Sequence, residues 1–178
     1  RETVRSTIGY LLEDAYTMLT GDSDPARRAQ FRPLFLEVAK ERQRRETVLF
    51  PGAEELLRAL HGHGVKTAIV STKRGDTIQY IMERYHLLDQ LEFVIGSEDV
   101  HAPKPDPQGL NMALERMGLK PEELLFCGDT VLDAGAAKNA GCPFCAVLNG
   151  TTPAGDFADF HPVHIAPDLF ELRQWLEG

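Results

Sequence analysis

The sequence predicts an α/β fold in which helices cover both faces of a parallel sheet. From about residue 48 to the C-terminus, segments with the apolar spacing of helices alternate with short apolar runs that are typical of buried strands. Before residue 48, apolar residues recur only at three- and four-residue spacing, as in amphipathic helices. Alternating helices and strands form parallel sheets, and their functional sites lie at the carboxyl ends of the strands.

Two parts of the chain are expected, residues 1–47 and residues 48–178. In the first part, apolar residues from Ile8 to Leu19 and from Phe31 to Ala39 predict two amphipathic helices. In the second part, helices are expected at residues 52–62, 75–86, 107–117, 131–140 and 168–176. Strands are expected at residues 66–71, 92–95, 123–127 and 143–148, with a weak strand at 163–165.

Composition restricts the class of function. A formal net charge of −8 over 178 residues argues against broad binding of nucleic acid, because a polyanion would be repelled. No apolar run approaches the about 20 residues that span a bilayer. The expected setting is therefore the cytoplasm, with no nucleic-acid or membrane partner. A small molecule is the expected partner, and a homodimer is left open.

The main candidate site is formed by two acidic residues that follow the strand expected at 123–127. Asp129 lies at the carboxyl end of this strand, and Asp133 lies one turn into the next helix. Such a pair can converge on a cation, and ligation by oxygen atoms alone suits Mg²⁺. The simpler alternatives are that Asp129 caps the helix and that Asp133 favours the helix dipole.

Two other segments are expected to join the same site. Lys104, followed by Pro105, Asp106 and Pro107, can hold a phosphoryl group as a point charge, and the prolines stiffen its backbone. Ser71 ends the strand expected at 66–71. The carboxyl ends of parallel strands meet at one edge of a sheet, so Ser71 is expected beside Asp129. The alternatives are a solvated lysine and a helix N-cap.

Taken in order, these residues resemble the haloacid dehalogenase superfamily of phosphatases. The family's motifs are an apolar strand ending in Ser or Thr, a lysine often followed by Pro-x-Pro, and a strand ending in Gly-Asp with a further acid. These motifs are matched by residues 67–71, residues 104–107, and Gly128, Asp129 and Asp133. The resemblance runs from about residue 48 to the C-terminus. It implies a Rossmann-like core domain over 48–178 and a partial helical cap domain over 1–47.

The family's catalytic segment has no counterpart in the sequence. Its nucleophile is the first Asp of an Asp-x-Asp motif that ends an apolar strand near the N-terminus. Asp22 and Asp24 have this spacing, but they lie in a polar turn that fits a helix N-cap better. Because the chain opens at Arg1 without an initiator Met, we expect it to begin inside the cap of a longer protein.

The resemblance implies a Mg²⁺-dependent phosphatase that acts through an aspartyl-phosphate intermediate. Asp129 and Asp133 would hold Mg²⁺, and Lys104 and Ser71 would serve catalysis. Ser71, Thr72 and Lys104 would bind phosphate, with the backbone N–H groups from Thr72 onward holding a phosphoryl oxygen at the start of the next helix. Residues 72–77 are most similar to the phosphoglycolate phosphatase and pyrophosphatase branch, so a small phosphorylated metabolite or pyrophosphate is expected. A phosphosugar mutase and a haloacid dehalogenase remain open. A haloacid dehalogenase needs no Mg²⁺, so the pair of expected Mg²⁺ ligands, Asp129 and Asp133, argues against it.

Two functions of other classes are also considered. A truncated, non-catalytic phosphate- or metal-binding module explains the missing nucleophile, but not the intact downstream motifs. A receiver-type signalling domain would need an acidic pocket at the first strand. In the family, the nucleophile strand lies between the strands that end at Ser71 and Cys127. Without it, we expect these two strands to remain unpaired and the chain alone to be poorly packed and inactive.

The cysteines do not predict a disulfide scaffold. Cys142 and Cys145 have Cys-x-x-Cys spacing, but they lead into a strand, whereas thioredoxin-like motifs open a helix. We interpret them as reduced thiols at the start of a strand, with a redox or zinc site as the alternative.

Overall fold

The computed structural model describes residue 7 and residues 10–178. Contacts divide the chain into two compact units, Arg1–Val48 and Leu49–Gly178. Each unit is treated by itself. Ile8, at the start of the first predicted helix, lies outside the described residues.

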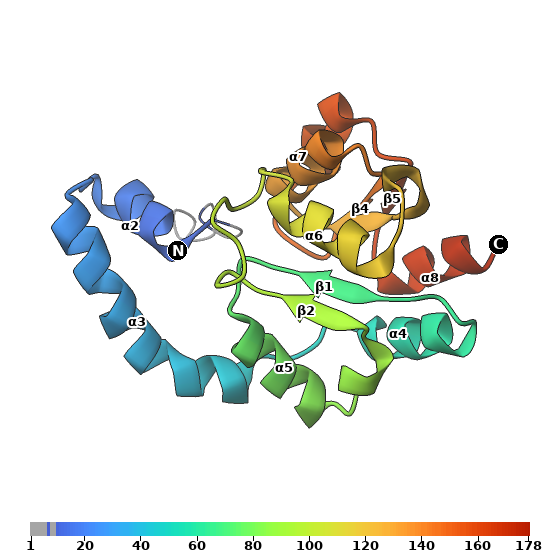
Figure 1. Cartoon of the computed structure of the whole chain (residues 1–178), viewed down its shortest axis with the longest axis horizontal. Coiled ribbons are helices and arrows are strands. Elements are labelled where there is room, and N and C mark those ends of the chain that lie inside the picture. The colour runs from blue at the N-terminus through green and yellow to red at the C-terminus, as the bar shows by residue number, and fades with distance from the viewer. Residues whose placement is uncertain (1–6, 8–9) are drawn as a thin grey trace. The chain divides into compact units, whose positions relative to one another are not determined.

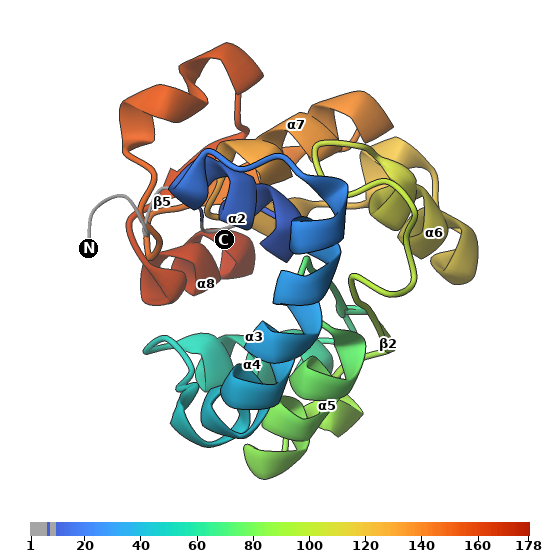
Figure 2. The same ribbon diagram turned by 90° about the vertical axis from the view of Figure 1, so that its left-hand side faces the viewer.

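The first unit consists of two helices, α2 (Leu12–Thr20) and α3 (Pro25–Glu46). They contact each other through the rings of Tyr16 and Phe31, whose centroids are 4.9 Å apart. An ion pair between Arg32 and Glu13, at 2.7 Å, also joins them. Figure 2 shows the two helices following each other through a short turn. The prediction of two helices in this region is confirmed, but α3 is polar around most of its circumference and longer than its apolar pattern suggested.

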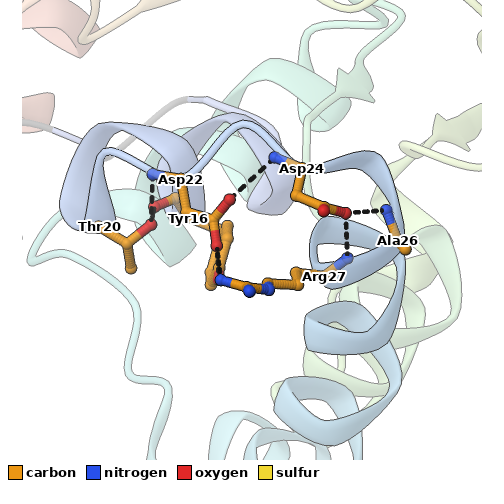
Figure 3. A network of polar contacts seen from close by, with 6 residues as sticks. All are labelled: Tyr16, Thr20, Asp22, Asp24, Ala26 and Arg27. Carbon is orange, nitrogen blue, oxygen red and sulfur yellow. Dashed lines mark hydrogen bonds and ion pairs between the residues drawn. The ribbon is translucent and has the colours of Figure 1, made fainter.

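The turn between α2 and α3 is held by Asp22 and Asp24. The Asp24 carboxylate accepts hydrogen bonds from the backbone N–H groups of Ala26 and Arg27, at 2.8 and 3.2 Å. Asp22 accepts a hydrogen bond from the Asp24 N–H at 2.9 Å and pairs with the Arg27 guanidinium at 2.9 Å (Figure 3). The interpretation of this Asp-x-Asp as a turn with a helix N-cap is therefore confirmed.

The second unit contains the predicted alternation of helices and strands (Figure 1). Its helices are α4 (Ala53–Gly62), α5 (Gly75–Arg84), α6 (Gln108–Met117), α7 (Val131–Ala140) and α8 (Leu169–Glu177). Its strands are β1 (Ala68–Val70), β2 (Phe93–Ile95), β3 (Phe126–Gly128), β4 (Phe144–Val147) and β5 (His164–Ala166). Short 3₁₀ helices complete it at η1 (Leu88–Gln90), η2 (Pro121–Glu123) and η3 (Ala154–Phe160). Within the described residues, no helix is both long and apolar enough to cross a membrane.

The strands form two separate parallel sheets. One contains β1 and β2, with Ala68 opposite Phe93, and the other has the order β3-β4-β5, with Phe126 opposite Phe144. Thus β1 and β3 do not pair with each other, as expected. Strands β1 and β3 are therefore edge strands of their sheets, and both lead into the candidate site described below.

Helices cover both faces of the three-stranded sheet, and β4 shows this most clearly. Phe144 and Ala146 pack in a cluster with residues of α6 and α7, whereas Cys145 and Val147 pack with residues of α4 and α8. Figures 1 and 2 both show α6 beside α7. All four residues of β4 are buried, which explains why this strand is an unbroken apolar run.

The smaller sheet rests on α5. Ile69 of β1 and Val94 of β2 pack against a buried cluster that includes Ile78 and Ile81 of α5. The neighbouring residue of β1, Val70, points to the other face and packs against the cluster beneath α6. The alternation along β1 therefore places helices on both faces of this strand as well.

Several element boundaries differ from the sequence prediction. The strand predicted at 123–127 begins only at Phe126. Residues 121–123 instead form η2, whose first residue is a proline. The loop predicted at residues 149–155 runs into η3, which the sequence analysis missed. This 3₁₀ helix buries Phe157 completely, with 0% exposure, against Phe144.

Replacing Phe157 with alanine should lower the free energy of unfolding by about 3–5 kcal/mol, because a fully buried aromatic ring leaves a cavity. Urea denaturation measures this change. Phe170→Ala is the matched control, since this ring is 47% exposed and its removal should have a much smaller effect. Equal losses in the two variants would show that η3 is not part of the core.

Candidate active site

The candidate site lies where β1 and β3 end. Ser71 directly follows β1, Asp129 directly follows β3, and Lys104 lies in the segment between β2 and α6. Lys104 is close to both strands, since its Nζ lies 3.5 Å from the Val70 carbonyl oxygen and 5.7 Å from the centre of the Phe126 ring. The structure therefore brings together the two strand ends that the sequence analysis assigned to one site.

Lys104 forms a buried ion pair with Asp133. Its Nζ donates a hydrogen bond to Asp133 Oδ1, and the two side chains are only 14% and 7% exposed. Such a pair interacts strongly because water does not screen it. The ion pair fixes the lysine ammonium beside the strand ends, with the aromatic face of Phe126 as an additional favourable contact.

Asp133 is also part of the cap of α7. Its Oδ2 accepts hydrogen bonds from the Thr130 N–H at 3.1 Å and the Thr130 hydroxyl at 2.6 Å. The Thr130 hydroxyl accepts one in return from the Asp133 N–H at 3.2 Å, which completes a capping box. Thr130 is therefore the N-cap, so the alternative that Asp129 caps this helix is wrong. The sequence analysis missed Thr130, although its spacing to Asp133 is a capping-box signal.

Asp129 has a different environment from Asp133. Burial raises the pKa of Asp129, and the negative charge of Asp133 raises it further, while Lys104 and Lys73 oppose the rise. The carboxylate lies against the backbone of Gly150, where an added Cβ would be 2.0 Å from Asp129 Oδ2. Only glycine fits at position 150 without displacing the carboxylate.

Ser71 lies at the site, but the groups around it are already partly engaged. Its hydroxyl accepts a hydrogen bond from the Lys73 N–H at 3.1 Å, while its own N–H donates to the Ile95 carbonyl at 2.9 Å. At the start of α5, the Gly75 N–H donates to both Glu98 carboxylate oxygens, at 3.0 and 3.1 Å. Thus Glu98 occupies the first N–H of this helix, which the sequence analysis had included among the phosphate-binding groups.

Two cations follow Ser71, and they differ in their pairing. Arg74 is bonded to Asp76 at 3.2 Å and lies 4.0 Å from Glu98, so its charge is compensated locally. Lys73 is exposed, and its charge acts on Asp129. The positive potential at the site therefore comes from Lys104 and Lys73 rather than from Arg74.

Asn149, at the end of β4, is a further polar residue that the sequence analysis missed. It lines a cavity of about 540 Å³ together with Asp129, Cys127 and Val70. Its Oδ1 atom is buried, and it has no hydrogen-bond partner among the described residues. The only available signal was its position after an apolar strand, and a polar residue there is common in any loop.

The acidic residues suit a cation only in part. Within the described ranges, no group of three or more His, Cys, Asp or Glu residues could hold a metal ion. Asp129 and Asp133 nevertheless repel each other, and a cation would relieve the repulsion that raises the pKa of Asp129. Because Mg²⁺ is usually held by one or two carboxylates together with water and phosphate oxygens, this donor set fits Mg²⁺. Asp129 would be the direct ligand, since both oxygens of Asp133 already accept hydrogen bonds.

The cysteines form a contact that their sequence spacing did not suggest. Cys127 of β3 lies opposite Cys145 of β4, and all three cysteines are free thiols. A hydrogen bond to Cys145 raises the pKa of Cys127. The neighbour of Cys145 is therefore Cys127 rather than Cys142.

Comparison with known proteins identifies the family. Residues 1–147 match the sequence model of the haloacid dehalogenase-like hydrolases. The chain belongs to this family. The match extends through Ser71, Lys104, Asp129 and Asp133, so all four lie within the region that defines membership.

Related sequences are phosphatases by name. A phosphoglycolate phosphatase of Salmonella typhimurium is 37% identical over 69% of this chain, and one of Vibrio vulnificus is 30% identical over 93%. The chain spans 47% of the Salmonella protein and 72% of the Vibrio protein. It thus corresponds to about half the length of the first of these relatives.

Solved structures share the fold. A protein from Bacteroides fragilis described as a haloacid dehalogenase-like hydrolase is 34% identical, with a TM-score of 0.93 over 96% of this chain and 81% of that one. A protein from Haemophilus somnus described as a predicted phosphoglycolate phosphatase has a TM-score of 0.85 over 97% of this chain and 80% of that one, at 22% identity. The second likeness concerns the fold alone.

Replacing Asp129 with asparagine should stabilise the chain at pH 7. A raised pKa means that the folded chain holds this proton more tightly than the unfolded chain, so stability falls as the pH rises through the folded-state pKa. The side-chain amide of asparagine does not ionise, so the variant avoids this loss of stability. The gain in melting temperature should shrink as the pH is lowered toward about 3.9, the ordinary value for Asp. Thermal denaturation between pH 4 and pH 7 measures it, and a lower melting temperature than the parent at pH 7 would contradict it.

The same substitution at Asp133 should have the opposite effect. Asp133→Asn removes the charge that compensates the buried Lys104, so the loss should approach the about 3–5 kcal/mol typical of broken buried pairs. Urea denaturation at pH 7 measures both variants side by side. Similar effects of the two substitutions would show that the two carboxylates do not have the distinct environments described above.

Proposed function

We propose that this chain is the larger part of a Mg²⁺-dependent phosphatase that hydrolyses a small phosphorylated metabolite or pyrophosphate. The observation that carries the proposal is the position of Lys104, whose ammonium is held by Asp133 beside the ends of both β1 and β3. A fixed cation at this position can stabilise the negative charge of a phosphoryl group during transfer. Membership of the hydrolase family supports the same reading.

The proposal gives the residues of the candidate site distinct roles. Asp129 would ligate Mg²⁺ directly. Asp133 would act on the metal ion indirectly and would hold Lys104 in place. When bound, Mg²⁺ would supply charge neutralisation for the phosphoryl oxygens. Lys104 would contact the phosphoryl group, and the Ser71 hydroxyl and the Thr72 N–H would hold one of its oxygens. Lys104 and Ser71 are thus the proposed catalytic residues of this chain.

The nucleophile is proposed to lie on a segment upstream of Arg1. In the family the nucleophile is an Asp that attacks phosphorus and forms an aspartyl-phosphate, which water then hydrolyses with the help of a second carboxyl group. Asp22 and Asp24 are engaged in the turn before α3, so they do not supply these groups. The 178-residue chain alone would therefore be inactive.

The proposed substrate is a small phosphorylated anion. Lys73 adds positive charge near Asp129, while the charge of Arg74 is compensated by Asp76. Two named relatives are phosphoglycolate phosphatases, and phosphoglycolate carries a compact group of negative charges. We further propose that the enzyme acts in the cytoplasm without a nucleic-acid or membrane partner, either as a monomer or as a homodimer.

A non-catalytic module is the second candidate, and the engagement of the chain's Asp-x-Asp residues, Asp22 and Asp24, in the turn before α3 favours it. Such a module would bind inorganic phosphate or Mg²⁺ without releasing product. The two candidates differ when the polypeptide is extended upstream of Arg1, because only the enzyme then gains phosphatase activity.

The proposal is tested by measuring phosphate release from phosphoglycolate and pyrophosphate with the extended polypeptide at millimolar Mg²⁺. Lys104→Met should lower kcat by about 10²–10³-fold, the range seen when one charge-stabilising donor is removed. Asp129→Asn should abolish activity, and a chelator should do the same to the parent. Lys120→Met, at an exposed lysine before η2, is the matched control and should retain activity. Full activity of Asp129→Asn would overturn the metal assignment.

A further inference from the structure

The loop that carries Lys104 takes its position from the elements around it. Residues 96–107, all of which the structure describes, link β2 to α6 by turns rather than by a helix or a strand. Lys104 nevertheless holds its ammonium within reach of Asp133 and of the end of β1. The contacts that fix the backbone of this loop therefore decide where the positive charge lies.

Hydrogen bonds within the loop make its second half locally rigid. The Asp106 N–H donates to the Pro103 carbonyl at 2.9 Å, which closes a turn around Lys104. The Gln108 side chain accepts hydrogen bonds from the N–H groups of residues 101–102, both at 2.9 Å, and so ties the loop to the first residue of α6. A shift at one point of this turn would therefore be passed to the backbone of Lys104.

Pro105, inside this turn, docks on one face of α7. Its carbonyl oxygen accepts a hydrogen bond from Asn139 Nδ2 at 2.9 Å. Its ring lies against Gly135, where an added Cβ would be 2.8 Å from Pro105 Cβ. Because residues four positions apart share one face of a helix, Gly135 and Asn139 form a single contact surface for the loop. The glycine permits the close approach, and the asparagine fixes its direction.

Helix α7 thus contacts the Lys104 segment in two ways. Asp133, in the first turn of α7, holds the ammonium of Lys104. Further along the same helix, Gly135 and Asn139 hold the backbone of the next residue, Pro105. An ammonium at the end of a flexible four-carbon chain is placed accurately only when its backbone is fixed as well.

We propose that Asn139 is a positioning residue for Lys104. By holding the Pro105 carbonyl, it keeps the lysine backbone where the ammonium reaches both Asp133 and the end of β1. Asn139 and Pro105 are both exposed, so their hydrogen bond competes with water and contributes little to the free energy of unfolding. The effect on catalysis rests on the proposed function, whereas the effect on the position of Lys104 does not.

Lys138 provides a matched control on the same turn of α7. It is exposed like Asn139, and its Nζ also donates to a backbone carbonyl, that of Asp159, at 3.4 Å. The same ammonium lies 5.8 Å from the centre of the Phe160 ring. Lys138 therefore ties α7 to η3 and not to the loop that carries Lys104.

The position of Lys104 is measured by trace acetylation of the 178-residue chain with acetic anhydride, followed by mass spectrometry of its peptides. Lys104 is 14% exposed, and its rate is expressed relative to that of exposed Lys120 in the same sample. Asn139→Ala should raise this ratio about three- to tenfold, the factor that one hydrogen bond of ordinary strength represents. Asn139→Asp, whose ionised carboxylate keeps the shape but cannot donate to a carbonyl, should do the same. Lys138→Met should leave the ratio unchanged.

A second readout is the hydrolysis of phosphoglycolate by the extended polypeptide. Loss of an interaction made in the transition state lowers kcat and leaves KM nearly unchanged, so Asn139→Ala should lower kcat by about three- to tenfold. In the Lys104→Met background the same substitution should cause no further loss, because Asn139 acts through Lys104. Lys138→Met should retain the kcat of the parent.

The outcomes separate a positioning role from a structural one. The melting temperature of Asn139→Ala should stay close to that of the parent, because the hydrogen bond is exposed. Equal acetylation of Lys104 in the parent and in both Asn139 variants would overturn the proposal. An equal rise in Lys138→Met would also overturn it, since it would show a general loosening of α7. If acetylation rises as expected but the extended parent releases no phosphate, the position of Lys104 is explained and the proposed function is wrong.

Discussion

The ion pair between Lys104 and Asp133 is the interaction on which the arrangement of the site depends. Lys104 comes from the segment after β2, and Asp133 comes from the first turn of α7 after β3, so the pair links the two sheets. Asp133 also completes the cap of α7 with Thr130, and Lys104 touches the end of β1. The Asp133 carboxylate therefore caps the start of α7 and fixes the position of the Lys104 ammonium. Through Lys104 it also links the ends of β1 and β3, although these two strands are not paired with each other.

The same region is destabilised by the features that suit it to function. Burial raises the pKa of Asp129, and the nearby carboxylate of Asp133 raises it further. Natural proteins accept this kind of cost at sites that bind charge, and a bound cation would relieve it. Within the described residues, the edges of β1 and β3 that face the site have no partner strand, which adds a second cost.

Much of the core could be predicted because its local signals agree with its packing. The helix over residues 131–140 has a capping box at its start and a glycine after its end, and it was predicted with the bounds that it has. Ser71, Lys104 and Asp129 could be assigned to one site because the carboxyl ends of parallel strands meet. In contrast, η3 depends on burial of Phe157 against Phe144, a tertiary contact with no local pattern. Glu98 at the start of α5 and Asn149 beside Asp129 also act across long separations in sequence, so spacing alone could not reveal them.

The central claim, that the Lys104–Asp133 pair couples the two halves of the core, is tested most directly by a double-mutant cycle. The free energy of unfolding is measured for the parent, Lys104→Met, Asp133→Asn and the double variant. If the pair acts as described, the two single losses should not add, and the interaction energy should be about 2–3 kcal/mol, near the upper end for contacting residues. An interaction energy near zero would show that each residue acts independently, and the account of the site as one unit held by this pair would be wrong.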